Sequence, residues 1–106
     1  MDWPQDADGD VMRRLSAAGF AFDKPTAIDF NVDFEDWPPD EPALAAISNA
    51  FPEATITQED GYVLVQITSI VSYEVVTSVQ ERLSALTANY GGRCDSWGLM
   101  QNPASN

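Results

Sequence analysis

The feature that most constrains this sequence is a segment in which apolar and polar side chains alternate strictly. Between Thr26 and Glu35 the two kinds of residue take turns, the apolar set being Ile28, Phe30, Val32 and Phe34 and the polar set Asp29, Asn31, Asp33 and Glu35. A period of two is typical of a β-strand with one face on a core and the other in water or on a partner. The chain must therefore build a sheet that has one apolar face and one acidic face.

The rest of the pattern predicts three helices and three further strands. A first helix begins near Asp8 or Asp10, either of which can cap it, and ends at Gly19. The remaining expected elements are a helix capped by Asp40 and closed by Pro52, a short strand over 54–57, a strand over 62–69 after an Asp-Gly turn, a long helix over 73–90 ended by Gly91-Gly92, and a last strand over 93–99.

The order of these elements indicates a fold class. A helix is followed twice by strand-helix-strand, which is the βαββαβ order of ferredoxin-like α+β folds with an extra N-terminal helix in front. In that architecture the helices cover one face of an antiparallel sheet, and the other face stays available. The 106 residues suit one domain. We expect a single ferredoxin-like domain over 8–99, a flexible N-terminal tail over 1–7 and a polar C-terminal tail over 100–106.

The charge balance restricts the partners. The chain has 17 acidic and 5 basic residues and no histidine, a formal net charge of -12. Such a surface repels nucleic-acid phosphates and anionic lipid headgroups and attracts basic protein segments, although solubility alone would also account for it. The sequence has no apolar run near the roughly 20 residues needed to span a bilayer. We therefore expect a protein partner, with no direct nucleic-acid binding and no membrane.

The N-terminal sequence and the single cysteine indicate a compartment. Cys94 has no partner for an intramolecular disulfide, which fits a reducing environment. The first residues lack the basic region and apolar stretch of a secretory signal. The expected location is the cytoplasm, with Cys94 as a small packing residue.

The sequence offers little support for catalysis. Without histidine, Ser-His-Asp and Cys-His arrangements are impossible, and no glycine-rich phosphate-binding loop is present. Asp6, Asp8 and Asp10 are spaced like the start of a calcium loop, but the later positions do not fit, and a helix-capping cluster is the better interpretation. Asp29 and Asp33 lie about 13 Å apart along a strand, too far to share a proton. We predict no enzyme activity, no catalytic residues, no cofactor and no metal site.

Several short motifs resemble one known family. They are Asp8-Gly9-Asp10-Val11-Met12-Arg13-Arg14-Leu15 followed by Gly19, Ala27-Ile28-Asp29-Phe30 with alternation after it, and Asn89-Tyr90-Gly91-Gly92-Arg93-Cys94-Asp95-Ser96-Trp97-Gly98. Together they resemble the regulator of ribonuclease E activity B family over most of the chain. Ser96 departs from the Asp-Gly-Trp-Gly form that is usual there, and this chain stops soon after Gly98.

The resemblance implies a non-catalytic inhibitor that binds the arginine-rich scaffold region of ribonuclease E and so modulates RNA decay. The expected partner-binding residues are Asp29, Asn31, Asp33, Glu35, Asp95, Trp97 and Gly98. Asp95 and Trp97 are two apart, so we expect them to share one face of the last strand. A binding role for this pair competes with a structural one, which we prefer: Trp97 is then a core residue, and Asp95 holds its indole N–H or a nearby backbone N–H.

Other functions remain open at this point. The same fold suits another protein target, such as a toxin to be neutralised, or assembly with itself, and we expect a monomer or a weak homo-oligomer. For an enzyme or a small-molecule binder, the best support in the sequence is the acidic strand face, which could act together with a divalent metal.

Overall fold

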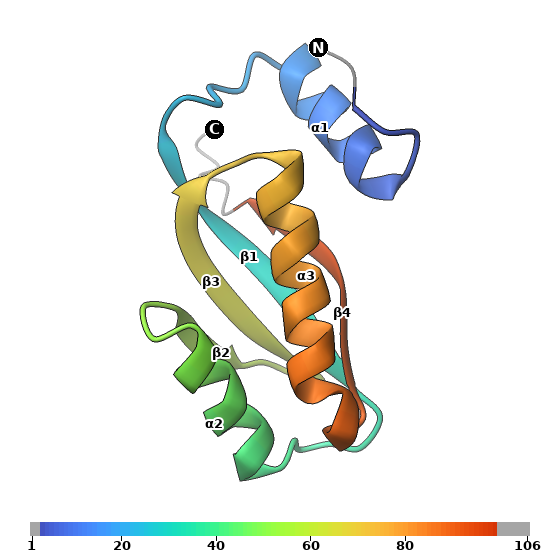
Figure 1. Ribbon diagram of the computed structural model, residues 1–106, viewed down its shortest axis with the longest axis vertical. Helices are drawn as coiled ribbons and strands as arrows, with labels where there is room; N and C mark the ends of the chain where they lie inside the picture. The colour runs from blue at the N-terminus through green and yellow to red at the C-terminus, as the bar shows by residue number, and fades with distance from the viewer. Residues whose placement is uncertain (1–2, 100–106) are drawn as a thin grey trace.

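The structure is a computed structural model that describes residues 3–99, so the whole expected C-terminal tail over 100–106 and the first two residues of the expected N-terminal tail lie outside the described residues. It is a mixed α+β structure in which three helices accompany a four-stranded antiparallel sheet (Figure 1). The elements are α1 (Ala7–Ala17), β1 (Pro25–Phe34), α2 (Glu41–Ala50), β2 (Thr55–Gln58), β3 (Tyr62–Ile70), α3 (Tyr73–Thr87), the 3₁₀ turn η1 (Ala88–Tyr90) and β4 (Gly92–Leu99).

The alternating segment forms a central strand of the sheet. The strand order is β2-β3-β1-β4, and every neighbouring pair is antiparallel. Within β1, Phe30 lies opposite Val65 of β3 on one side and opposite Trp97 of β4 on the other. The predicted strand is confirmed with a shift of one residue at each end.

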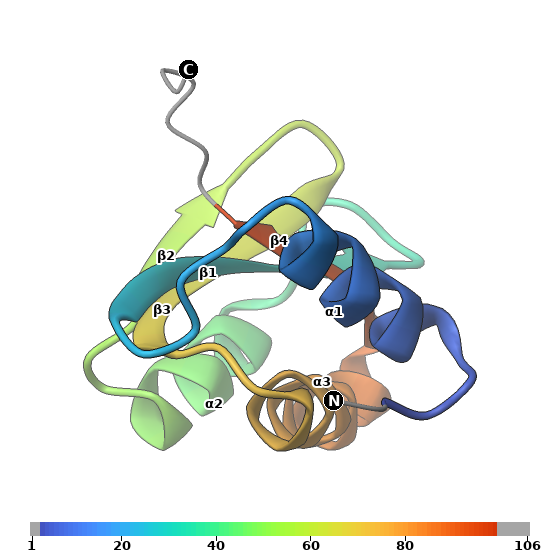
Figure 2. The same cartoon turned by 90° about the horizontal axis from the view of Figure 1, so that it is seen from above.

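The apolar face of the sheet packs on α2 and α3, which lie on the same side of it (Figure 2). Ile28, Phe30 and Val32 are fully buried there, as the period of two requires. The other buried apolar residues are Met12, Phe34, Ala43, Ile47, Val63, Val65, Val71, Val76, Leu83 and Cys94. The opposite face carries the acidic row of β1 and is called the open sheet face below.

The caps of two helices differ from the sequence prediction. The carboxylate of Asp6 caps α1 by accepting the backbone N–H of Gly9 at 2.7 Å, so the prediction of Asp8 or Asp10 as the cap was wrong. Asp40 occupies the expected N-cap position of α2, but its side chain makes no capping hydrogen bond. At α1 several acidic residues stand near the helix start, and the backbone path selects Asp6 as the cap.

The N-terminal residues pack against the first helix. The ring of Trp3 lies 5.9 Å from that of Phe22, and the Arg13 guanidinium donates to the Trp3 carbonyl at 2.9 Å. A Cβ at Gly9 would lie 1.8 Å from the Pro4 carbonyl oxygen. Gly9 therefore allows this segment to cross directly over the start of α1, within residues that the sequence assigned to a tail.

The long helix ends as the two glycines predicted. The α-helical part stops at Thr87, one 3₁₀ turn follows, and Gly91 takes a left-handed conformation at φ 76°. A Cβ at Gly92 would lie 2.6 Å from Thr87 and 2.8 Å from Phe34. The chain can thus turn directly from α3 into β4 beside the core. No helix within residues 3–99 has the length and apolar character to cross a membrane.

Candidate partner-binding surface

The open sheet face brings together several of the predicted residues. Asp29, Asn31 and Asp33 project from β1 in one row, with Asp33 exposed and the other two half-buried. Their neighbours on β3 are Gln66, Leu64 and Tyr62, and those on β4 are Gly98, Ser96 and Arg93. The face is therefore a four-stranded surface in which the inner strand β1 carries the acidic side chains.

Asp29 is oriented by β3 and uncrowded on the side of β4. Its Oδ1 accepts a hydrogen bond from Gln66 Nε2 at 2.9 Å. On the other side Gly98 lies opposite Asp29, and a Cβ built there would meet no atom within 4 Å. No contact with the described residues therefore requires glycine at position 98, and its missing side chain leaves space beside Asp29.

Asn31 and Asp33 occupy the middle and far end of the row. The Asn31 amide Nδ2 donates to Ser96 Oγ at 3.2 Å, which gives the serine a defined contact. Asp33 lies opposite Arg93, whose guanidinium pairs with Asp95 at 3.0 Å. Glu35 lies just beyond the strand and is exposed, and its backbone N–H donates to the Gly91 carbonyl at 2.9 Å.

A β-bulge in β4 changes the expected relation between Asp95 and Trp97. Asn31 lies opposite Ser96, whereas Val32 lies opposite Cys94, so the register shifts and Asp95 is the extra residue. Trp97 follows Phe30 on the core side, and Asp95 is exposed. The bulge breaks the period of two between Cys94 and Ser96, so simple alternation no longer determines whether Asp95 and Trp97 share a face.

Trp97 is anchored by a residue from the other end of the chain. Its indole Nε1 donates to Asp8 Oδ1 at 2.9 Å, and Gln80 Nε2 donates to Asp8 Oδ2 at 3.1 Å. Gln80 is 7% exposed, so its amide depends on this partner and on the Val76 carbonyl, which accepts at 2.9 Å. The indole partner is Asp8 rather than Asp95. This contact joins α1, α3 and β4, and it gives Trp97 a structural role.

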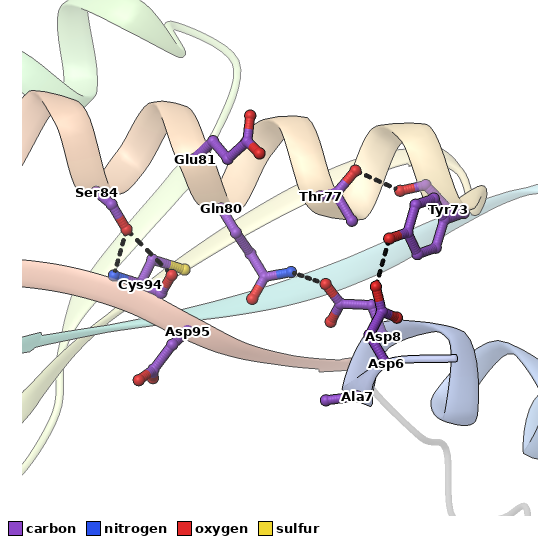
Figure 3. A pocket seen from close by; sticks show the side chains of 10 residues that line it. All are labelled: Asp6, Ala7, Asp8, Tyr73, Thr77, Gln80, Glu81, Ser84, Cys94 and Asp95. Atoms are coloured by element: carbon purple, nitrogen blue, oxygen red, sulfur yellow. Dashed lines mark hydrogen bonds between the residues drawn. The ribbon is translucent and has the colours of Figure 1, made fainter. Parts of the chain in front are cut away.

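A shallow pocket of about 720 Å³ lies at this junction, with Asp6, Asp8, Gln80, Cys94 and Asp95 in its lining (Figure 3). The Tyr73 hydroxyl donates to Asp6 Oδ2 at 2.6 Å. That bond lowers the pKa of the Asp6 carboxyl and raises the pKa of Tyr73 to about 12. Burial raises the pKa of the Cys94 thiol to about 12. A thiol of that kind is a poor nucleophile, which agrees with the packing role expected for it.

The three early aspartates separate into three different roles. Asp6 caps α1, Asp8 anchors Trp97 and Gln80, and Asp10 pairs with Arg13. Across residues 3–99, no three His, Cys, Asp or Glu side chains are grouped so that they would hold a metal ion. The structure thus uses the cluster for helix capping and packing contacts.

Two kinds of residue escaped the sequence analysis. Tyr62 and Leu64 are half-buried apolar side chains on the open sheet face, beside Asp33 and Asn31. Their alternation with Val63 and Val65 already placed them on the side away from the core, so the pattern contained the signal. Gln80 gave no such signal, because its role depends on a partner from α1.

Comparison with known protein families matches residues 5–99 to the family described as regulator of ribonuclease activity B. The chain belongs to the regulator of ribonuclease activity B family. The match covers most of the chain and includes both the start of α1 and the end of β4. Comparison with curated proteins gave no match. The resemblance seen in the sequence is thereby confirmed at the level of the family.

The Asp8–Trp97 contact joins two of the motifs by which the chain resembles the regulator of ribonuclease activity B family. The two family-like motifs at the ends of the chain meet in space, 89 residues apart in sequence. The regulator family also implies a function exerted on a ribonuclease rather than a known catalytic activity. The acidic row of the open sheet face, which lies away from that junction, is the candidate contact surface.

Proposed function

We propose that this protein regulates a ribonuclease by binding a basic segment of a partner protein on its open sheet face, without catalysing a reaction itself. Family membership supports the connection with ribonuclease activity. The observation that carries the binding mode is the acidic row, in which Asp29 and Asp33 project from the inner strand β1 on the sheet face opposite α2 and α3 (Figure 2). A net charge of -12 favours a basic partner and disfavours RNA on this surface.

The specific partner that we propose is the arginine-rich scaffold region of ribonuclease E, with inhibition of the enzyme as the result. Tyr62 and Leu64 would add apolar contact beside the charges, as in interfaces where a buried centre is ringed by polar groups. Trp97 and Asp95 would contribute mainly by holding β4, with Gly98 leaving room beside Asp29. We further propose that 8–99 acts in the cytoplasm as one domain and as a monomer or weak homo-oligomer.

The finer fold assignment is part of this proposal. The element order and the strand order β2-β3-β1-β4 support a ferredoxin-like sheet preceded by α1. In such a sheet a partner can contact the face opposite the two helices without disturbing the core.

The test is a binding titration of the purified protein against the scaffold region of ribonuclease E, with enzyme activity measured in parallel. The test variant is Asp29→Asn, Asp33→Asn, which keeps an acceptor for Gln66 and removes two charges. Two charge contacts of about 0.7–1 kcal/mol each predict a Kd that is about tenfold to thirtyfold weaker. Binding should also weaken as salt rises, because exposed charges are screened beyond about 8 Å at physiological ionic strength.

The matched control is Glu74→Gln, Glu81→Gln, which changes the net charge equally on α3, outside the open sheet face. This control should alter the Kd by less than about threefold, since it changes only the long-range field. Equal weakening by both double variants would contradict a contact on the open sheet face. Absence of binding and of inhibition by the unaltered protein would refute the proposed partner.

A further inference from the structure

The two edges of the sheet are protected to very different degrees. At β4, the Ser84 hydroxyl accepts the Cys94 N–H at 2.9 Å and donates to the Cys94 carbonyl at 3.1 Å. The same strand carries the bulge at Asp95 and the Arg93–Asp95 ion pair. Bulges, charges and side-chain cover are devices that discourage pairing with another strand. The β4 edge is therefore closed over its middle.

The β2 edge has almost none of these devices. Among residues 3–99, β2 forms the edge of the sheet opposite β4 and pairs only with β3, over Thr55–Gln58. Its four residues contain three β-branched side chains and no charge or proline, and only its shortness limits pairing. Residues of this kind favour strand pairing, and an unpaired edge presents free backbone N–H and C=O groups. The outer side of β2 is thus suited to accept an added strand.

A groove runs beside this edge. It has a volume of about 430 Å³ and lies between α2 and β2, with Leu44, Ala45 and Ile56 as its apolar lining. Ile56 lies opposite Val65 and so belongs to the core side of the sheet. A strand added about 4.8 Å beyond β2 would direct alternate side chains into this groove. Its other side chains would continue the open sheet face beside Thr55 and Thr57.

The charges around the edge select the chemistry of the added strand. The segment from Glu41 to Ile70 contains no lysine or arginine. Its four acidic residues are all near β2 in sequence or in the groove: Glu41 lines the groove, Glu53 precedes the strand, and Glu59 and Asp60 follow it. An incoming segment with basic side chains would find opposite charges at both ends of β2.

We propose that β2 binds an extended basic segment of the partner by strand addition, with alternate apolar side chains in the groove between α2 and β2. This inference rests on the proposed function and adds a second contact for the partner at the sheet edge, two strands away from the acidic row of β1. Backbone hydrogen bonds supply affinity in this mode, while alternate pockets supply selectivity. A second copy of the chain is a poorer occupant, because each copy carries a charge of -12 and pairing of the two β2 edges would bring their acidic residues together.

The probe is the synthetic peptide Arg-Val-Arg-Val-Arg-Val-Arg, compared with the block sequence Arg-Arg-Arg-Arg-Val-Val-Val of equal charge. The alternating peptide should bind at least about tenfold more tightly, since only it presents one apolar and one basic face as a strand. Two further forms are N-methylated, one on every valine and one on every arginine. In a paired strand, alternate residues direct their N–H groups to opposite sides, so only one of these forms should lose affinity. Equal effects of the two methylations would overturn strand addition.

The protein variant is Ala45→Arg, which fills the groove with a bulky cation at an exposed position of α2. Its control is Ala85→Arg, an equal change at an exposed position of α3. Ala45→Arg should weaken the binding of the alternating peptide at least about tenfold, and Ala85→Arg should weaken it less than about threefold. Amide exchange of Thr55–Gln58 should slow when the peptide binds. Unchanged exchange, or equal effects of the two variants, would refute the β2 site.

The outcomes separate this inference from the proposed function. Loss of ribonuclease binding in Asp29→Asn, Asp33→Asn with full binding in Ala45→Arg would leave the proposed function intact and eliminate the β2 edge. A dimer by light scattering that Ala45→Arg dissociates would overturn the basic occupant in favour of a second copy.

Discussion

The contact between Asp8 and Trp97 gives the sharpest prediction about stability. In Asp8→Ala the indole N–H of Trp97 and one N–H of Gln80 lose their acceptor. Hydrogen bonds to a charged group contribute about 1.5–3 kcal/mol each, and a buried donor left unsatisfied is costly. The adjoining pocket allows water to replace part of these two hydrogen bonds, so we expect a total at or slightly below the roughly 3 kcal/mol that the lower end of the range gives for two bonds.

The expected loss is about 2–3 kcal/mol of unfolding free energy, or a fall in Tm of about 10 °C for a domain of this size. The measurement is urea unfolding followed by tryptophan fluorescence and circular dichroism, with coincident transitions checked first. Asp10→Ala is the matched control, because it removes an acidic residue from the same first turn and breaks an exposed ion pair with Arg13. That control should cost less than about 1 kcal/mol.

A double-mutant cycle with Trp97→Phe isolates the contact itself. Trp97→Phe keeps an aromatic ring but removes the N–H, so its cost and that of Asp8→Ala should not add. A coupling free energy of about 1 kcal/mol or more is expected for residues in direct contact. Additive costs within about 0.3 kcal/mol would refute the reasoning, as would an Asp8→Ala variant no less stable than Asp10→Ala.

Three further predictions concern single sites. Gly92→Ala should lower the unfolding free energy by about 1–3 kcal/mol, because the new Cβ would collide with the core. Gly98→Ala on the same strand should change it by less than about 0.5 kcal/mol, and equal losses in urea unfolding would contradict this prediction. Tyr73 should titrate near its raised pKa of about 12, and Asp6→Asn should bring the pKa of Tyr73 down toward 10.0 in an absorbance titration; a Tyr73 pKa unaffected by Asp6→Asn would count against the bond. The Tyr73–Asp6 bond should contribute fully to stability between pH 3.8 and pH 10, and this contribution should be lost as the pH rises through 12 or as acid protonates Asp6 below pH 3.8. Cys94, whose pKa burial raises to about 12, should react with a thiol reagent at pH 8 far more slowly in the folded protein than in urea, and equal rates would show that the thiol is accessible.

The sequence alone predicted the sheet and its orientation. The alternation in β1 required one buried and one acidic face, because side chains on a strand project to opposite sides whatever the partner strands are. The paired glycines at 91 and 92 likewise predicted the end of the long helix, since a left-handed residue stops a helix locally. Such features depend on a few consecutive residues, so they can be predicted from the sequence without the tertiary structure.

Only the tertiary structure decided which residues meet. The bulge at Asp95 depends on how β4 aligns with β1, and no local sequence pattern in β4 predicts this shift of register. The Asp8–Trp97 bond joins residues 89 positions apart, and the sequence offered Asp95 as a closer candidate. The bare edge of β2 and the groove beside α2 exist only because the sheet order leaves β2 outermost. Composition and periodicity therefore determine what each segment can become, whereas register and packing between distant segments determine which surface is left to bind a partner.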